Sequence, residues 1–421
     1  MPNLLTLLIQ IIVILGLARL VGIVFKKIHQ PAVMGEMVAG IILGPSLLGW
    51  LSPAISASLF PPSSLGFLSA LSQIGIIIFM FLVGLELDTA SLKKQGHTAV
   101  LISHVSIAMP FFFGVMLSLY LYPRLSDSSV TFISFALFMG AAMSITAFPV
   151  LARILTERKM TRSKVGTITI ACAAVDDVTA WFILAGIIVF ARSAEAPNPL
   201  WLTIVGSLGY IAVMVGGVRH LLRGLADSHR RSGHITQNMI ALILLILFIS
   251  ALTTEYLGIH ALFGAFLAGA IMPKDRAFVQ DLLNKVSSIT VILLLPLFFA
   301  FTGLRTRIGL LSGAQMWTYC AIIVVVAIIG KLGGSMIAAR ISGISWREAG
   351  AVGTLMNTRG LMELVILNIG LDIGVISEAL FSMMVLMALI TTFMTTPLLT
   401  LIYGESHTRQ EVLNVGEETA T

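Results

Sequence analysis

The chain has 421 residues, of which 57% are hydrophobic and only 11% are charged, and its mean hydropathy is +0.99. This composition excludes an ordinary soluble globular protein and predicts an all-α polytopic membrane protein with little room for a soluble domain. The pI of about 9.5 would also suit a nucleic-acid-binding protein. Because Lys and Arg cluster at the ends of apolar segments, we expect the lipid bilayer and no nucleic acid as the partner.

Apolar runs separated by charged, Pro and Gly clusters predict about thirteen transmembrane helices of roughly 17–28 residues. The first run has no basic segment before it and no small-residue cleavage site after it. We therefore expect a retained first helix and not a signal peptide. In chain order the predicted helices cover 3–25, 31–49, 66–87, 97–121, 128–156, 164–191, 199–222, 235–255, 258–272, 281–304, 313–341, 346–371 and 376–403.

Loop charge predicts the orientation of these helices. One set of alternate loops carries only Arg124, Arg192, Arg305 and Arg307, whereas the other set is strongly basic. By the positive-inside rule the basic set is cytoplasmic, with the N-terminus outside and the C-terminus inside. Residues 1–404 would form the transmembrane domain, and 405–421 a short, disordered cytoplasmic tail. The basic loops contain Lys26, Lys27, Lys93, Lys94, Arg158, Lys159, Arg162, Lys164, Arg223, Arg230, Arg231, Lys274, Arg276 and Arg347.

Two adjacent aspartates, Asp176 and Asp177, lie in the middle of the predicted helix at 164–191. A charged side chain there costs at least ~2.5–3.5 kcal/mol on insertion scales, and such residues mark ion or proton pathways. Two neighbouring carboxylates repel each other, so at least one requires a cation or a proton. Lys331, inside another apolar run, offers a counter-charge. A purely structural ion pair with Lys331 would leave the second carboxylate unexplained.

Two other predicted helices are interrupted near their centres by polar or helix-breaking residues. The first carries Thr146 and Pro149, and the second carries the run Asn357, Thr358, Arg359 and Gly360. An ordinary proline kink and a misplaced loop are the alternative explanations. Because the two helices run in opposite directions, the joint pattern indicates an inverted repeat whose broken helices meet at a transport site.

The remaining candidates carry weaker signals. Arg359 and Glu363 are four residues apart, so their expected role is a local ion pair on one helix. His260 is expected to be a packed or interfacial histidine, in preference to a pH sensor. Cys172 and Cys320 are expected to be packing residues. The sequence has no phosphate-binding loop, no dinucleotide fingerprint and no Cys/His metal cluster. We therefore expect no cofactor and no enzymatic activity.

Several segments together resemble a known family, the monovalent cation:proton antiporter superfamily, in the branch that holds bacterial Na⁺ and K⁺ antiporters and plant cation/proton exchangers. The resemblance covers almost the whole chain. It implies an NhaA-type antiporter fold, with inverted repeats and two discontinuous crossing helices. The segments that carry it are QPAVMGEMVAGIILGPSLLG, IIIFMFLVGLELD, SITAFPVLARIL, AAVDDVTAW, GIHALFGAFLAGAIMP, GKLGG, MNTRGLMELVILNIGL and FMTTPLL.

The resemblance also implies roles for the site residues. Asp177 would bind the monovalent cation and the proton alternately, Asp176 would pair with Lys331, and Thr146 and the Asn357 region would lie at the helix crossing. The expected protein is a homodimer in the inner membrane of a bacterium that serves pH homeostasis. Family members with paired aspartates tend to be electrogenic.

The predicted function is exchange of Na⁺ or K⁺ for protons by alternating access. Two carboxylates and one lysine allow two protons per cation if Lys331 or Asp176 also changes protonation, and we hypothesise such electrogenic exchange. A permanent Asp176–Lys331 pair would instead give one-for-one exchange. The alternatives are a cation channel or K⁺ efflux protein and, far behind, an intramembrane aspartyl protease, for which neighbouring aspartates on one helix are badly placed.

Overall fold

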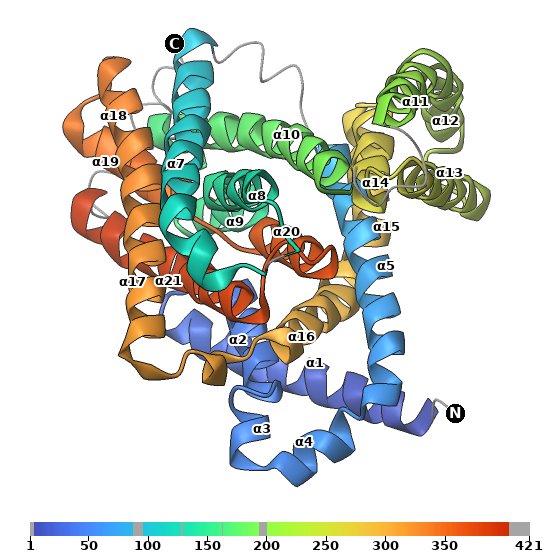
Figure 1. The fold of residues 1–421 in the computed structure, drawn as a ribbon. Helices are drawn as coiled ribbons and strands as arrows, with labels where there is room; N and C mark the ends of the chain where they lie inside the picture. Colours follow the sequence, from blue (N-terminus) through green and yellow to red (C-terminus); the bar gives the residue numbers. More distant parts are fainter. Residues whose placement is uncertain (1–3, 87–95, 128, 162, 193–199, 404–421) are drawn as a thin grey trace. The chain divides into compact units, whose positions relative to one another are not determined.

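The computed structural model describes residues 4–86, 96–127, 129–161, 163–192 and 200–403 (Figure 1). The predicted tail at 405–421 and the basic loop residues Lys93, Lys94 and Arg162 lie outside these ranges. The described chain consists of helices and their connections and contains no strand, which confirms the predicted all-α class.

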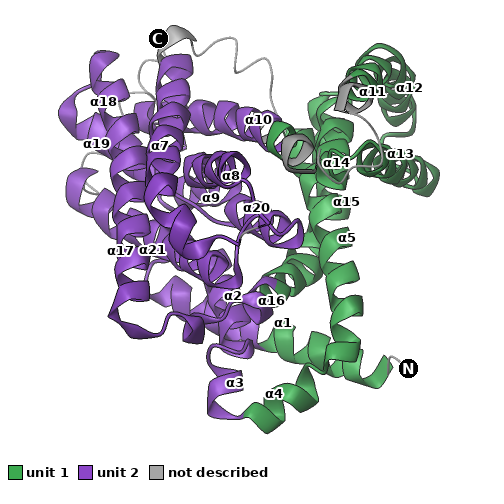
Figure 2. Ribbon diagram, in the orientation of Figure 1, with its two compact units in different colours: residues 1–16, 53–88, 185–301 green, residues 17–52, 89–184, 302–421 purple. Residues whose placement is uncertain are grey.

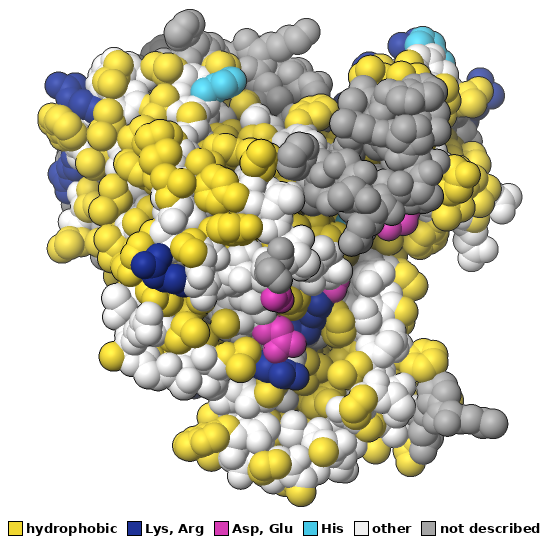
Figure 3. Space-filling model, in the orientation of Figure 1, with side chains coloured by type: hydrophobic (Ala, Val, Ile, Leu, Met, Phe, Trp, Pro, Cys, Tyr) yellow, Lys and Arg dark blue, Asp and Glu magenta, His cyan; other side chains and the backbone are white. Residues whose placement is uncertain are grey.

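Eleven stretches of the described chain are long and apolar enough to cross a membrane. Two predicted spans are not among them. The run at 258–272 yields only the ten-residue helix α14 (Ala261–Ala270), and 346–371 yields two short helices with a break between them. The predicted count of thirteen is therefore not confirmed. Hydrophobic side chains cover much of the face in Figure 3, as expected for an integral membrane protein.

The chain divides into two compact units (Figure 2). The first comprises residues 1–16, 53–88 and 185–301, and the second comprises 17–52, 89–184 and 302–421. Three helices have residues in both units: α1 (Leu4–Lys27), α10 (Lys164–Arg192) and α16 (Leu295–Arg305).

The first unit is held together by close helix packing at small residues. A Cβ atom at Gly84 of α5 would lie 2.1 Å from Phe266 O of α14, and one at Gly269 of α14 would lie 2.0 Å from Phe81 O. Glycine is required at both positions because the two backbones touch. This unit contains α4 (Pro53–Leu59), α5 (Pro62–Glu86), α11 (Leu200–Val213), π-helical η1 (Met214–Val218), α12 (Arg219–Ser232), α13 (Gln237–Tyr256), α14, α15 (Arg276–Ile289) and π-helical η2 (Thr290–Leu294).

The second unit contains every predicted site residue except His260. A buried apolar cluster that includes Leu151, Cys172 and Val352 joins several of its helices, both short and long. Its elements are α2 (Ala32–Leu43), α3 (Leu48–Leu51), α7 (Gly96–Leu125), α8 (Phe132–Ser144), α9 (Phe148–Glu157), the 3₁₀ turn η3 (Ile308–Leu310), α17 (Gly313–Ile328), π-helical η4 (Ile329–Gly333), α18 (Gly334–Ile341), α19 (Trp346–Met356), α20 (Leu361–Asp372) and α21 (Glu378–Tyr403).

Candidate ion-binding site

The predicted helix at 128–156 is discontinuous. Helix α8 ends at Ser144, the backbone is extended at Ile145, and α9 begins at Phe148. Pro149 stands in the first turn of α9. The fixed φ of proline suits a helix start, and its missing N–H removes no helical hydrogen bond there. Pro149 therefore begins a helix here and does not kink the interior of one.

The second break, Asn357–Gly360, separates α19 from α20. Asn357, Thr358 and Arg359 are at most 1% exposed, so this segment is not a surface loop. A Cβ atom at Gly360 would lie 2.8 Å from Val150 Cγ2 of α9, which explains why glycine is found where the two broken helices approach.

The two breaks contact each other directly. The Ala147 N–H donates to Thr358 O at 3.0 Å, and the Thr146 hydroxyl donates to Met356 O at 3.1 Å. Each interrupted region thereby provides hydrogen-bond partners for polar groups of the other that have no helical partner. Irregular backbone is tolerated at membrane depth when it is buried and satisfied in this way. The two discontinuous crossing helices predicted from the resemblance are present.

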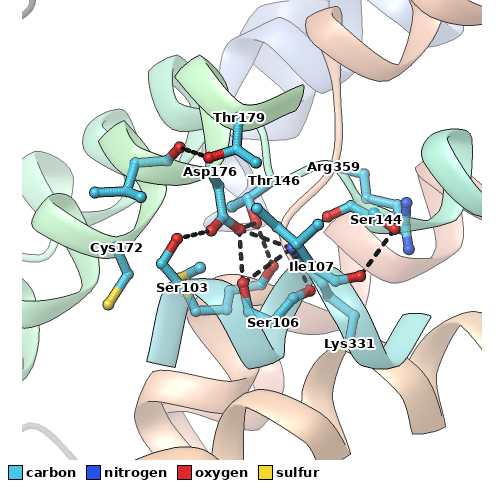
Figure 4. A network of polar contacts seen from close by, with 12 residues as sticks. Ser103, Ser106, Ile107, Ser144, Thr146, Cys172, Asp176, Thr179, Lys331 and Arg359 are labelled. Carbon is cyan, nitrogen blue, oxygen red and sulfur yellow. Dashed lines mark hydrogen bonds and ion pairs between the residues drawn. The ribbon is translucent and has the colours of Figure 1, made fainter. Parts of the chain in front are cut away.

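Asp176 accepts hydrogen bonds from four side chains (Figure 4). Oδ1 accepts from the Ser103 hydroxyl at 2.6 Å. Oδ2 accepts from the Ser106 hydroxyl at 2.7 Å, the Thr146 hydroxyl at 2.8 Å and the Lys331 ammonium at 2.8 Å. An ionised carboxylate offers about four lone-pair positions, so this set satisfies Asp176 in its charged form.

Lys331 is fully buried in the π-helical turn η4 and is satisfied as an ammonium. Its three N–H donors have three acceptors that cannot donate in return: Asp176 Oδ2, Ser106 O at 2.9 Å and Ser144 O at 2.5 Å. A neutral amine would lack one of these donors and would place a lone pair against an oxygen. The site thus holds an ion pair whose two members are both hydrogen-bonded in their charged forms.

Asp177, the next residue, is in the opposite condition. It is 2% exposed, and neither of its carboxylate oxygens has a side-chain hydrogen-bond partner among the described residues; the backbone N–H of Phe148, at the start of α9, lies near this carboxylate. A buried carboxylate without donors is costly, and a bound proton or a cation removes that cost. The arrangement can therefore take up one positive charge at Asp177.

Arg359 and Glu363 form a second buried ion pair at 2.7 Å, both with fully buried side chains. The Arg359 guanidinium also donates to Ala142 O at 2.9 Å and to Met143 O at 2.5 Å, the last turn of α8. The predicted local pair is present, and it additionally joins the two broken helices. His260 belongs to the first unit, where its Nδ1 accepts from the Leu262 N–H at the start of α14.

Three residues of this arrangement were absent from the sequence-based prediction. Ser103 and Ser106 are one helical turn apart in an apolar run, a spacing that places both on one face and could have indicated them. Thr392 of α21 accepts from the Arg359 N–H at 2.9 Å and donates to Arg359 O at 2.6 Å. It replaces the helical hydrogen bonds that the break removes, and nothing in the sequence distinguishes it from its neighbour Thr391.

Comparison with known proteins identifies the family. Residues 12–401 match the family described as sodium/hydrogen exchanger, transmembrane. The chain is 45% identical over 402 residues to the Na(+)/H(+) antiporter NhaS4 of Synechocystis sp., covering 95% of this chain and 98% of that protein. It is 40% identical over 413 residues to the Cation/H(+) antiporter 17 of Arabidopsis thaliana, covering 97% of this chain and 50% of that protein.

Other relatives and a solved structure agree with this match. The K(+)/H(+) antiporter 1 of Saccharomyces cerevisiae is 35% identical over 408 residues, with 95% of this chain and 46% of that protein covered. The chain spans about half the length of these plant and yeast relatives. The sodium proton antiporter MjNhaP1 from Methanocaldococcus jannaschii has the same fold, with a TM-score of 0.65 at 15% identity over 96% of this chain and 98% of that one. The predicted resemblance is confirmed: the chain belongs to the sodium/hydrogen exchanger family.

Proposed function

We propose that the chain exchanges a monovalent cation, Na⁺ or K⁺, for protons across the membrane, and that Asp177 binds the two in turn. Family membership and the similarity to proteins named Na⁺/H⁺ and K⁺/H⁺ antiporters support the exchange. The observation that supports the role of Asp177 is its buried carboxylate, which has no partner among the described residues and lies next to a fully hydrogen-bonded ion pair. Such a transporter needs no cofactor, because the cation and the proton are its substrates.

The charges of the site explain how one carboxylate can serve both substrates. Asp176 and Lys331 neutralise each other, so an ionised Asp177 leaves the site with one net negative charge. A bound cation or proton removes that charge, and the neutral site can then change its access from one side of the low-dielectric membrane to the other at lower cost. The empty, charged site is disfavoured in transit, which couples the two fluxes.

The same geometry favours one proton per cation over the electrogenic alternative. Two protons per cation would require Asp176 to accept a proton or Lys331 to release one. A protonated Asp176 would direct an O–H towards a set of donors, and a neutral Lys331 would leave one of its three acceptors without a donor. We therefore propose electroneutral one-for-one exchange, in place of the electrogenic exchange hypothesised from sequence.

The channel and protease alternatives are less well supported. A channel favours a continuous polar path, whereas here two buried ion pairs, Asp176–Lys331 and Arg359–Glu363, lie where the broken helices meet. The two aspartates are neighbours on α10 and do not face each other across two helices. From the resemblance we further propose a homodimer in a bacterial inner membrane that serves pH homeostasis, with the N-terminus outside, the C-terminus and the 405–421 tail in the cytoplasm, and alternating access by movement of one helix bundle.

Transport in proteoliposomes tests the proposed function. An imposed pH gradient is applied to the purified chain, and Na⁺, K⁺, Li⁺ and Rb⁺ are added in turn while the internal pH is followed. We expect saturable, cation-dependent proton flux with Na⁺ or K⁺. Flux that rises linearly with cation concentration and is independent of the proton gradient would indicate a channel, and absence of any coupled flux would contradict the proposal.

A further inference from the structure

Helices α8 and α19 both end at the crossing, but the donors that bind their last carbonyls differ. At the end of α8, the carbonyls of Ala142 and Met143 accept from the Arg359 guanidinium, and Ser144 O accepts from the Lys331 ammonium. The last carbonyls of a helix form the negative end of its dipole. Two cationic side chains therefore offset the negative end of α8.

The donors at the end of α19 are neutral. Met356 O lies 3.1 Å from the Thr146 hydroxyl, whose one O–H it shares with Asp176 Oδ2. Leu355 O accepts from the Thr358 N–H, and Gly353 O accepts from the Asn357 N–H. The negative end of α19 thus has hydrogen bonds at these carbonyls without a cation among their donors. A mobile cation at this end would be stabilised in the way that Arg359 and Lys331 stabilise the end of α8.

Asn357, the residue that caps α19, offers an oxygen at this position. Its side chain is 1% exposed, and its Nδ2 donates to Met394 Sδ at 3.8 Å. Its Oδ1 has no hydrogen-bond partner among the described residues. A buried amide oxygen without a donor calls for a bound ion or water, because it would otherwise lose its hydration without compensation.

A single hydroxyl connects this end of α19 to the aspartate pair. Thr146 Oγ1 lies 2.8 Å from Asp176 Oδ2 and 3.1 Å from Met356 O. The residue that follows each of these two acceptors, Asp177 or Asn357, has buried side-chain oxygens without a hydrogen-bond partner among the described residues, as do Gln30, Ser335 and Glu363 of the same unit. Thr146 Oγ1 therefore connects Asp176 and Met356, and the residue after each of them carries an unpartnered oxygen: the carboxylate of Asp177 and the amide of Asn357.

We propose that Asn357 Oδ1 is a neutral ligand of the transported cation, alongside the carboxylate of Asp177. This inference rests on the function proposed above. An alkali cation exchanges its water for several oxygen ligands, and carbonyl-type oxygens serve this purpose. A proton needs only one carboxylate oxygen, so the amide strengthens binding of the cation without strengthening binding of the proton. Asn357 thereby sets the cation concentration at which the cation displaces the proton.

Asn357→Ala tests the proposal in the proteoliposome assay. Loss of one ligand should raise the cation KM about tenfold, with the maximal rate at saturating cation retained within about twofold. The matched control is Met394→Leu, which removes the partner of the Asn357 amide nitrogen and leaves Oδ1 in place, and which should keep the wild-type KM. A KM that is unchanged in Asn357→Ala, or raised equally in Met394→Leu, would overturn the proposal.

Asn357→Asp and a binding measurement cover the case in which the alanine variant folds poorly. The aspartate variant keeps an oxygen at this position, so its cation KM should be no higher than that of the wild type, and an increase like that of alanine would contradict a ligand role. Cations that bind the folded protein raise its melting temperature, and this increase should be smaller in Asn357→Ala at equal concentrations of NaCl and KCl. If the wild-type protein shows no coupled flux, the proposed function fails. If the wild-type protein shows coupled flux and the Asn357 variants have the same cation KM and the same cation-dependent melting temperature, the function stands and this inference fails.

Discussion

Asp176 and Asp177 are neighbours on α10, yet the protein surrounds them differently. Asp176 accepts from three hydroxyls and one ammonium, whereas both oxygens of Asp177 lack a partner among the described residues. Successive residues of a helix point about 100° apart, so one carboxylate can face α7 and Lys331 while the other faces elsewhere. The difference separates a fixed charge from an exchangeable one within a single helical turn.

Among the variants that test the difference between the two aspartates, Asp177→Asn should have the largest effect, on transport. The substitution keeps the shape of the side chain and removes the charge that attracts a cation. We expect complete loss of cation-dependent proton flux in proteoliposomes, with the protein still folded and eluting as the wild type in size-exclusion chromatography. Wild-type exchange by the purified variant would remove Asp177 from the mechanism.

Removing one member of the Asp176–Lys331 pair should have the next largest effect, on stability. An uncompensated buried charge typically costs ~3–5 kcal/mol. Asp176→Ala and Lys331→Ala should each lower the melting temperature in detergent, and the double variant should recover part of the loss. Additive losses in this double-mutant cycle would show that the two charges are not coupled.

Ser103→Ala and Ser106→Ala should have a smaller effect that sharpens the contrast between the two aspartates. Each removes a hydrogen bond to a charged carboxylate, worth about 1.5–3 kcal/mol. Ser118→Ala is the matched control, because Ser118 is equally buried on α7 and donates only to Gly114 O of its own helix. Of the three variants, we expect Ser118→Ala to have the melting temperature nearest to that of the wild type. Equal losses in all three variants would mean that the bonds to Asp176 carry no special weight.

The smallest effect is expected at an accessible carboxylate. The hydrogen bond from Arg230 and the N–H groups of Phe278 and Ala277 hold the pKa of Asp275 below its ordinary value, at the start of α15. A lowered pKa in the folded state stabilises the protein above the unfolded pKa, and this stabilisation is lost as the pH falls through the folded value. Asp275→Asn should therefore lower the melting temperature slightly at neutral pH, and the difference should disappear once the pH is below the lowered pKa of Asp275. A difference that persists at low pH would assign it to a cause other than this charge.

Much of this architecture follows from the sequence, because the signals are strong in apolar surroundings. The charged pair Asp176 and Asp177, the counter-charge Lys331 and the two helix breaks stand out as polar or helix-breaking residues within hydrophobic runs. The spacing of Ser103 and Ser106 is a weak signal and Thr392 carries none, since serine and threonine occur throughout these helices with hydroxyls bonded to their own backbone. Which hydroxyl instead reaches Asp176 or Arg359 depends on how helices distant in sequence pack. The predicted count of thirteen spans is not confirmed: eleven stretches of the described chain are long and apolar enough to cross a membrane, and the other two predicted runs form short or interrupted helices.

The ratio of charge moved to cation moved tests the central claim most directly. Purified protein in liposomes is studied by tracer uptake of the cation and by current on a solid-supported membrane under the same ion gradients. If Asp177 alone exchanges a proton while Asp176 and Lys331 remain charged, uptake should proceed without a steady current and should not respond to an imposed membrane potential. A cation-induced current that is abolished in Asp177→Asn, with uptake driven by the potential at ~2.3 kcal/mol per charge per 100 mV, would show that a second proton moves and would contradict the account.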